Sequence, residues 1–290
     1  YLGFGLSPAV CICLVYVLDR KTALRREIRT AVRIEIGYLI FLFVTIPCGM
    51  VFSVSADNIY SRGPHFYIYI VMYFGAILYL SASTVITARE FQNRSRLLIY
   101  PLILFVMAET IIQVALPELH VTWLCVTLLS VLYFIYCSEM WNQLDALTGL
   151  LNQNSYLKQT GGVRCKGGVL VVFDVDDFKQ INDQYGHIQG DLCLAGIAEC
   201  IKKSYANFGY CYRIGGDEFC VLLKNGGNEG RCKQEFLQRL QEKRGEIAFL
   251  PTVSYGSAPF SGEDIVKVKD RADQDMYQYK KERKNRKRLS

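Results

Sequence analysis

Five long apolar stretches fill the first half of this 290-residue sequence and limit what it can fold into. They cover approximately 1–18, 37–54, 66–88, 97–116 and 119–137. A helix needs about 20 apolar residues to cross the hydrocarbon core of a bilayer, and these stretches reach or approach that length. They are apolar all round, whereas a surface helix of a soluble protein keeps a polar stripe. We therefore predict an all-α transmembrane bundle of about five helices over 1–137. Because the chain begins at Tyr1 and not at Met, we expect its first helix to be truncated.

The cations between these stretches predict how the bundle is oriented. The connections 19–36 and 89–96 hold nine Lys and Arg residues, whereas 55–65 and 117–118 hold only Arg62. Loops rich in Lys and Arg stay in the cytoplasm during membrane insertion. Five spans then place the chain after residue 137 in the cytosol. We expect a multi-pass protein of the cell (inner, or cytoplasmic) membrane, with the lipid bilayer as a partner.

Composition argues against several other classes of protein. The eleven cysteines form no Cys-x-x-Cys pair and no metal-binding spacing, so we expect reduced thiols and no disulfide framework. The net charge is +6, and seven Lys and Arg residues gather within 280–288. This basic tail lacks interleaved aromatic residues, and the sequence lacks zinc-finger spacing, so we expect no nucleic-acid partner. Contact of the tail with phosphate groups or a membrane surface is the simpler interpretation.

The second half has the mixed charge and short apolar segments of a soluble domain. We predict a short helical linker at 138–144 and the soluble domain at 145–290. In that domain, the apolar and β-branched segment 168–174 indicates a buried strand, and 210–214 and 218–223 flank a Gly-Gly-Asp turn as a β-hairpin does. Helices near 189–203, 228–243 and 263–283 and a strand near 252–257 complete an α/β plan with an antiparallel component.

Three carboxylates lie at the ends of these predicted strands. Asp174 ends the buried strand, and Asp217 and Glu218 lie on the hairpin turn. If the hairpin pairs beside the first strand, Asp174 and Asp217 meet at one end of the sheet, where their like charges require a cation. Hard oxygen ligands suit Mg²⁺, and the glycines before Asp217 leave room for a phosphate group. The residues alone therefore allow a metal–nucleotide site, although a Gly-Gly-Asp turn is most often an ordinary hairpin.

Several motifs accompany this turn, and together they resemble one known family. The string Gly215-Gly216-Asp217-Glu218-Phe219 is the signature after which the GGDEF family of diguanylate cyclases is named. Segment 145–152 resembles the entry motif of that family, and 173–191 resembles its metal and guanine segment. Tyr212-Arg213 precedes the signature as expected, and 272–280 resembles the final helix. The resemblance implies an α/β (α+β) domain of the nucleotide-cyclase type with a central mixed sheet.

The resemblance also implies a role for each matching residue. Asp174, the backbone carbonyl of Val175 and Asp217 would hold Mg²⁺, or Mn²⁺ in its place. Asp217, Glu218 and Lys179 would serve catalysis, with Lys179 also neutralising the triphosphate. The residues expected to bind the substrate GTP are Asn182 and Asp191 at the guanine edge, Phe178 and Leu194 beside the base, Gly215 and Gly216 near the phosphates, and Lys280 and Lys284 on the triphosphate.

Several of these positions have a structural explanation as well. Asn182 could cap the end of a helix, Asp191 could begin the next helix, and Lys280 could be ordinary solvated surface. Their joint occurrence in the order of the family favours the functional interpretation.

The sequence departs from the family pattern at three places. Ala206 and Gly209 stand where the product-inhibition motif has Arg and Asp, which puts feedback inhibition in doubt. Gln153 follows Asn152 where the family usually has Arg. The usual Gly-Arg-Asn near the end is Arg283-Lys284-Asn285. The last two differences put only catalytic efficiency in doubt.

These observations predict a membrane-anchored diguanylate cyclase that condenses two GTP into cyclic di-GMP and two pyrophosphates. Because one site holds one GTP, two domains must face each other in a homodimer. The membrane half would act as the sensor of a signal ligand that the sequence does not identify. The alternative is a catalytically inactive GGDEF-type receptor that binds nucleotide. A third alternative is a transporter or structural membrane protein with an incidental domain.

Overall fold

The computed structural model describes residues 2–18, 25–54, 60–90, 99–115, 122–161, 167–224 and 226–289. The chain divides into two compact units, Tyr1–Trp141 and Asn142–Ser290, and each is described by itself. The ten cysteines within the described residues are all free.

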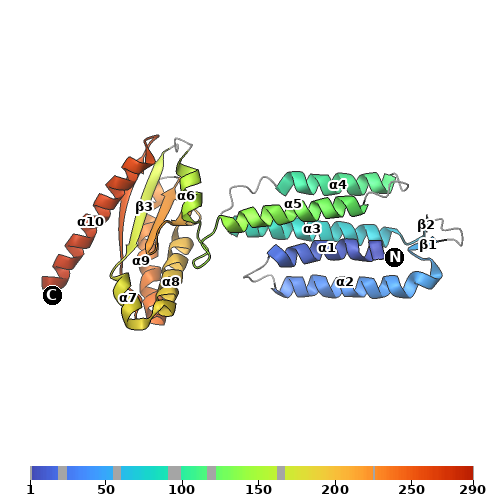
Figure 1. Cartoon of the computed structure of the whole chain (residues 1–290), viewed down its shortest axis with the longest axis horizontal. Helices are drawn as coiled ribbons and strands as arrows, with labels where there is room; N and C mark the ends of the chain where they lie inside the picture. Colours follow the sequence, from blue (N-terminus) through green and yellow to red (C-terminus); the bar gives the residue numbers. More distant parts are fainter. Residues whose placement is uncertain are drawn as a thin grey trace. The chain divides into compact units, whose positions relative to one another are not determined.

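The first unit consists mainly of helices (Figure 1). Three of them are long and apolar enough to cross a membrane, over Glu27–Cys48, Tyr67–Ala88 and Leu124–Asn142, and Gly5–Val17 is a shorter apolar helix. The helices that the structure describes in this unit are α1 (Leu2–Leu18), α2 (Arg25–Thr45), α3 (Tyr67–Glu90), α4 (Ile99–Ala115) and α5 (Thr122–Asn142). A helix therefore lies at or near each predicted span, and five crossings of a bilayer remain a prediction.

The second predicted span, 37–54, has the wrong boundaries. Helix α2 already begins at Arg25 and ends at Thr45, so 25–36 is helix and not a connecting loop. Arg and Glu are good helix formers, and a helix continues through them whether or not they lie in lipid. A 3₁₀ turn (Ile46–Cys48) containing Pro47 follows, and Gly49 takes a φ of +61° that suits glycine. The chain then forms a short antiparallel hairpin, β1 (Phe52–Val54) with β2 (Tyr60–Arg62).

The second unit is built around a four-stranded sheet in the order β4-β5-β3-β6. Its strands are β3 (Gly168–Val175), β4 (Gly209–Arg213), β5 (Glu218–Leu223) and β6 (Val253–Phe260). The three ladders between these strands are antiparallel, and a single parallel bridge from Leu151 to Tyr212 makes the sheet mixed. The helices are α6 (Gln153–Thr160), α7 (Phe178–Tyr185), α8 (His187–Tyr205), α9 (Glu229–Glu246) and α10 (Ile265–Leu289), with a 3₁₀ turn at Gly226–Asn228. This mixed α/β plan confirms the predicted fold class.

Alternate residues of β3 fill two hydrophobic cores, one on each face of the sheet. Phe173 packs in one core with Ile197 of α8 and Phe236 of α9. Leu170 packs in the other core with residues of α6 and α10. Because side chains of a strand point to opposite faces in turn, a strand buried on both faces is apolar throughout. Asp174 interrupts this apolar run where β3 reaches the end of the sheet.

A glycine in β6 sets how closely α10 lies on the sheet. A Cβ atom on Gly256 would collide with the backbone carbonyl oxygen of Ala272 and the backbone nitrogen of Met276. Without a side chain at this position, the backbones of strand and helix come into contact. This close approach determines the position of the later turns of α10, which carry Lys280 and Arg283.

Candidate active site

Two carboxylates face each other across neighbouring strands at one end of the sheet. Asp174 of β3 lies directly opposite Glu218 of β5 and, on its other side, opposite Ser254 of β6. Residues paired in this way point to the same face of a sheet, and two like charges there repel each other unless a cation balances them. The prediction that the hairpin pairs beside the first strand is confirmed.

Lys280 supplies a positive charge at this place. Its Nζ donates to Oδ1 of Asp174 over 2.6 Å and lies 3.4 Å from Oδ1 of Asp176. Burial lowers the pKa of Lys280, but the hydrogen bond and charge of Asp174, together with Asp176, outweigh it and raise the pKa above its ordinary value. The interpretation of Lys280 as ordinary solvated surface is therefore wrong.

Asp176, to which the sequence had assigned no role, is a buried and fully bonded carboxylate of the site. It is 9% exposed. It accepts hydrogen bonds of 2.7 Å each from Thr252 and Ser254 and one of 3.1 Å from Nη1 of Arg283. Asp176 thus joins the ends of β3 and β6 to α10, and Arg283 holds α10 one turn beyond Lys280. A carboxylate directly after a buried strand, with two hydroxyl residues at the start of another strand, was the available signal.

The turn between β4 and β5 is braced by Arg213. Its guanidinium donates to the carbonyl oxygen of Gly216 over 2.7 Å and forms an ion pair of 3.0 Å with Asp145. Asp145 also accepts from the backbone and hydroxyl of Thr148. Burial raises the pKa of Asp145, but the hydrogen bonds from Thr148 and Arg213 outweigh it and hold the pKa below its ordinary value. The predicted entry motif is thereby bonded to the signature turn.

Gly215 and Gly216 provide space in this turn. Neither is among the described glycines with positive φ, so the turn does not need the left-handed conformation. A Cβ atom on Gly216 would meet open space, whereas one on Gly215 would approach Glu218. Both glycines are exposed, as access for a phosphate group requires.

The oxygen atoms near the end of β3 fit a hard divalent cation. Asp174 and Glu218 are paired across the strands, and the backbone N–H of Val175 donates to the carbonyl oxygen of Asp217 over 3.2 Å. Asp217 is half-buried and adjacent to both strands. Within the described residues, no three His, Cys, Asp or Glu side chains are close enough to form a metal cage. Mg²⁺ rarely needs such a cage, because it keeps waters and substrate phosphates in its shell.

The predicted guanine-reading residues lie together where α7 and α8 meet. Oδ1 of Asn182 is buried, and the structure shows no hydrogen-bond partner for it among the residues it describes. Gly190 lies against this oxygen so closely that a Cβ atom would collide with it, and the ring of Phe178 is the next neighbour. Asp191 follows Gly190 and is exposed. The side-chain oxygen of Asn182 therefore caps no helix, and an unpaired polar atom beside an aromatic ring suits a site for a polar base.

The positions of the remaining predicted residues say less about their roles. Leu194 is 2% exposed and belongs to the main hydrophobic core. Lys179 is exposed in the first turn of α7. The side chain of Lys284 lies outside what the structure describes.

Comparison with known proteins agrees with this arrangement. The family model described as "Diguanylate cyclase, GGDEF domain" matches residues 142–286, which is half of the chain. The chain therefore belongs to the GGDEF family of diguanylate cyclase domains.

Curated relatives include diguanylate cyclases from several bacteria. Diguanylate cyclase DgcS of Shewanella oneidensis is 32% identical over 50% of this chain and 52% of its own length. Diguanylate cyclase A of Treponema denticola is 30% identical over 49% of this chain and 40% of its own length. Diguanylate cyclase DgcZ of Escherichia coli is 29% identical over 53% of this chain and 55% of its own length. The chain thus spans about half the length of these relatives or less.

Solved structures of single GGDEF domains are also similar to about half of the chain. One is a microbial GGDEF domain described for its interaction with cyclic di-GMP, with 30% identity, a TM-score of 0.39 and coverage of 48% of this chain and 92% of that one. Another is the GGDEF domain of DgcB from Caulobacter crescentus in complex with c-di-GMP, with 27% identity, a TM-score of 0.38 and coverage of 48% and 90%.

Proposed function

We propose that the protein is a membrane-anchored diguanylate cyclase that condenses two GTP into cyclic di-GMP and two pyrophosphates. The observation that carries this proposal is the grouping at one sheet end of Asp174, the Gly-Gly-Asp-Glu turn and Lys280. Membership of the GGDEF family supports the same reaction.

Different residues of the site would bind the guanine base and the triphosphate of GTP. Asn182 and Asp191 would read the guanine, because a carboxylate accepts from N1–H and the 2-amino group together while an amide can donate to O6. Phe178, with Leu194 behind it, would lie beside the base. Lys179, Lys280 and Lys284 would balance the charge of the triphosphate. Gly215 and Gly216 would leave room for it.

A divalent cation would complete this site, held by Asp174, Asp217 and the carbonyl of Val175. Mg²⁺ or Mn²⁺ bound there supplies charge stabilisation for phosphoryl transfer. In that state Lys280 would turn from Asp174 to the phosphates.

The reaction requires two copies of the domain. The 3′-oxygen of one GTP forms a bond to the α-phosphorus of the other, the bond from that phosphorus to pyrophosphate breaks, and the hydroxyl proton leaves with help from Glu218. The same exchange in the opposite direction closes the ring and releases the second pyrophosphate. Since one site holds one nucleotide, we propose a homodimer with facing sites.

The first unit would hold the protein in the cell membrane as a multi-pass bundle and act as its sensor. Three helices of sufficient length and apolar character support the anchoring. The Lys and Arg residues that precede and begin α2, together with those of 89–96, support a catalytic unit in the cytosol.

The intact protein in lipid nanodiscs tests the proposal. With GTP and Mg²⁺ we expect cyclic di-GMP and pyrophosphate in a ratio of one to two. Asp217→Asn should lower turnover by about 100-fold or more, the scale seen when one group that stabilises transition-state charge is lost. Asp270→Asn, on an exposed face of α10, serves as the matched control and should keep full activity. Binding of GTP without any product would refute the cyclase and leave a nucleotide receptor.

A further inference from the structure

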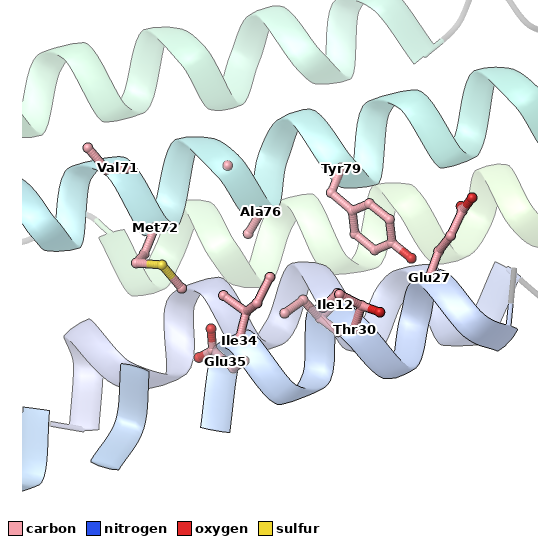
Figure 2. A pocket seen from close by; sticks show the side chains of 11 residues that line it. Ile12, Glu27, Thr30, Ile34, Glu35, Val71, Met72, Ala76 and Tyr79 are labelled. Atoms are coloured by element: carbon pink, nitrogen blue, oxygen red, sulfur yellow. The ribbon is translucent and has the colours of Figure 1, made fainter. Parts of the chain in front are cut away.

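A cavity of about 520 Å³ lies in the first unit among helices α1, α2 and α3. Figure 2 shows Glu35, Met72 and Val71 toward one end of it and Glu27, Thr30 and Tyr79 toward the other. Its volume falls in the range of about 300–1,000 Å³ that is usual for pockets that hold small organic molecules. The proposed cyclase reaction makes no use of this space.

Glu35 is the unexplained group in this cavity. It is 5% exposed, and neither of its carboxylate oxygens has a hydrogen-bond partner within the described part of the chain. It lies inside the span Glu27–Cys48, eight residues from Glu27, which corresponds to about 12 Å along a helix. An ionisable side chain is expensive inside a membrane and is usually paired or functional.

The walls of the cavity supply no counter-charge to Glu35. None of the described residues that line it is Lys, Arg or His. Most of the lining is apolar, with contributions from Ile12, Ala31, Ile34, Val71, Met72 and Ala76. A partner for the carboxylate must therefore enter with the ligand, and the rest of that ligand must be apolar to match the walls.

We propose that this cavity is a binding site for a small amphiphilic organic cation, whose ammonium group pairs with Glu35 and whose apolar body lies against α1 and α3. Charge complementarity and the dimensions of the space select this class of ligand. The site is separate from the nucleotide site and does not depend on cyclase activity.

A pair of probes with the same apolar body tests the proposal. 4-Phenylbutylamine carries the ammonium group, and 4-phenylbutanol replaces it with a hydroxyl group. Equilibrium binding of each labelled probe is measured on the intact protein in phosphatidylcholine nanodiscs, with empty nanodiscs correcting for partition into lipid. We expect saturable binding of the amine about tenfold tighter than that of the alcohol, since a hydrogen bond to a charged group is worth about one factor of ten or more.

Three variants separate the contributions of charge, position and space. Glu35→Gln has nearly the same shape and should remove the preference for the amine while still admitting both probes weakly. Glu27→Gln changes an exposed carboxylate of the same lining and should keep the preference. Gly75→Leu should exclude both probes, because a Cβ atom at this lining position meets open space and a larger side chain can fill it without displacing neighbours.

Binding of the amine no stronger than to empty nanodiscs, or equal binding of the two probes, would overturn the proposal. A preference for the amine that survives in Glu35→Gln would also overturn it.

Discussion

The two units of the chain each bury a carboxylate, and they treat it in opposite ways. In the second unit, Asp176 accepts hydrogen bonds from Thr252, Ser254 and Arg283. In the first unit, Glu35 lies in the wall of a cavity without any such partner among the described residues. Burial of a charge is expensive unless the charge is paired. The bonds of Asp176 therefore stabilise the fold, whereas Glu35 is buried without a partner to balance it. We therefore interpret Asp176 as a residue that positions its neighbours and Glu35 as a candidate contact for a ligand.

The largest effect that tests this comparison should come from Asp176→Ala. The substitution leaves Arg283 without its buried partner and breaks two further hydrogen bonds, so we expect a loss of about 3 kcal/mol in the free energy of unfolding of the second unit. Chemical denaturation followed by tryptophan fluorescence and circular dichroism measures it. Asp270→Ala, an exposed change on α10, should stay within about 0.5 kcal/mol of the parent. Equal stability of the two variants would show that Asp176 does not hold α10 to the sheet.

Gly190→Ala tests a polar atom of the second unit that has no hydrogen-bond partner among the described residues, Oδ1 of Asn182. An added Cβ atom would collide with that oxygen and displace the amide. We expect GTP binding to weaken by about tenfold or more, as loss of a specific hydrogen bond in a buried site implies. Titration with a non-hydrolysable GTP analogue measures it, and Gly245→Ala on α9, where a Cβ atom meets nothing within 4 Å, is the matched control. Unchanged affinity would remove Asn182 from the nucleotide site.

Asp145→Asn examines a partly buried pair, and its effect should depend on pH. The pKa of Asp145 is lower in the folded protein than its ordinary value of 3.8, despite burial, because Thr148 and Arg213 stabilise the charged form. A group of this kind contributes stability above its unfolded pKa, and that contribution is lost as the pH falls toward the folded pKa. We expect the variant to be about 1 kcal/mol less stable at pH 7, with the difference shrinking below about pH 4. A difference independent of pH would mean that the charge of Asp145 does not contribute.

The smallest effect should come from Glu35→Gln. Because the carboxylate has no partner to lose, its neutral analogue should leave the thermal unfolding temperature of the protein in nanodiscs unchanged or slightly higher. Thermal unfolding monitored at matched lipid composition measures this. A clear fall in unfolding temperature would indicate that Glu35 has a stabilising partner, as Asp176 does, and would contradict the proposed difference between the two carboxylates.

The sequence allowed more to be predicted for the second unit than for the first. Pairing of β3 with the hairpin followed from strand patterns and from the order of motifs. The sequence predicted that Asp174 would meet Asp217, whereas the strand register places Glu218 directly opposite Asp174. Asp176 was missed because its partners, Thr252 and Ser254, are 76 and 78 positions away along the chain. In the first unit, apolar composition located the helices but could not locate where α2 begins, because charged helix formers extend it beyond the apolar run. Where a helix is apolar on every side, its sequence has no periodic pattern that shows which side packs against a neighbouring helix. The cavity around Glu35 could therefore not be predicted.

The contact at Gly256 has a consequence for how freely this sequence can vary. Any side chain there would force α10 away from β6, and that helix carries both Lys280 and Arg283. A saturation library at this position should therefore show near-complete intolerance, including toward alanine, although Gly256 touches neither nucleotide nor metal in the proposed reaction. One backbone contact inside the domain thus places a limit on sequence drift that a survey of reactive groups alone would overlook.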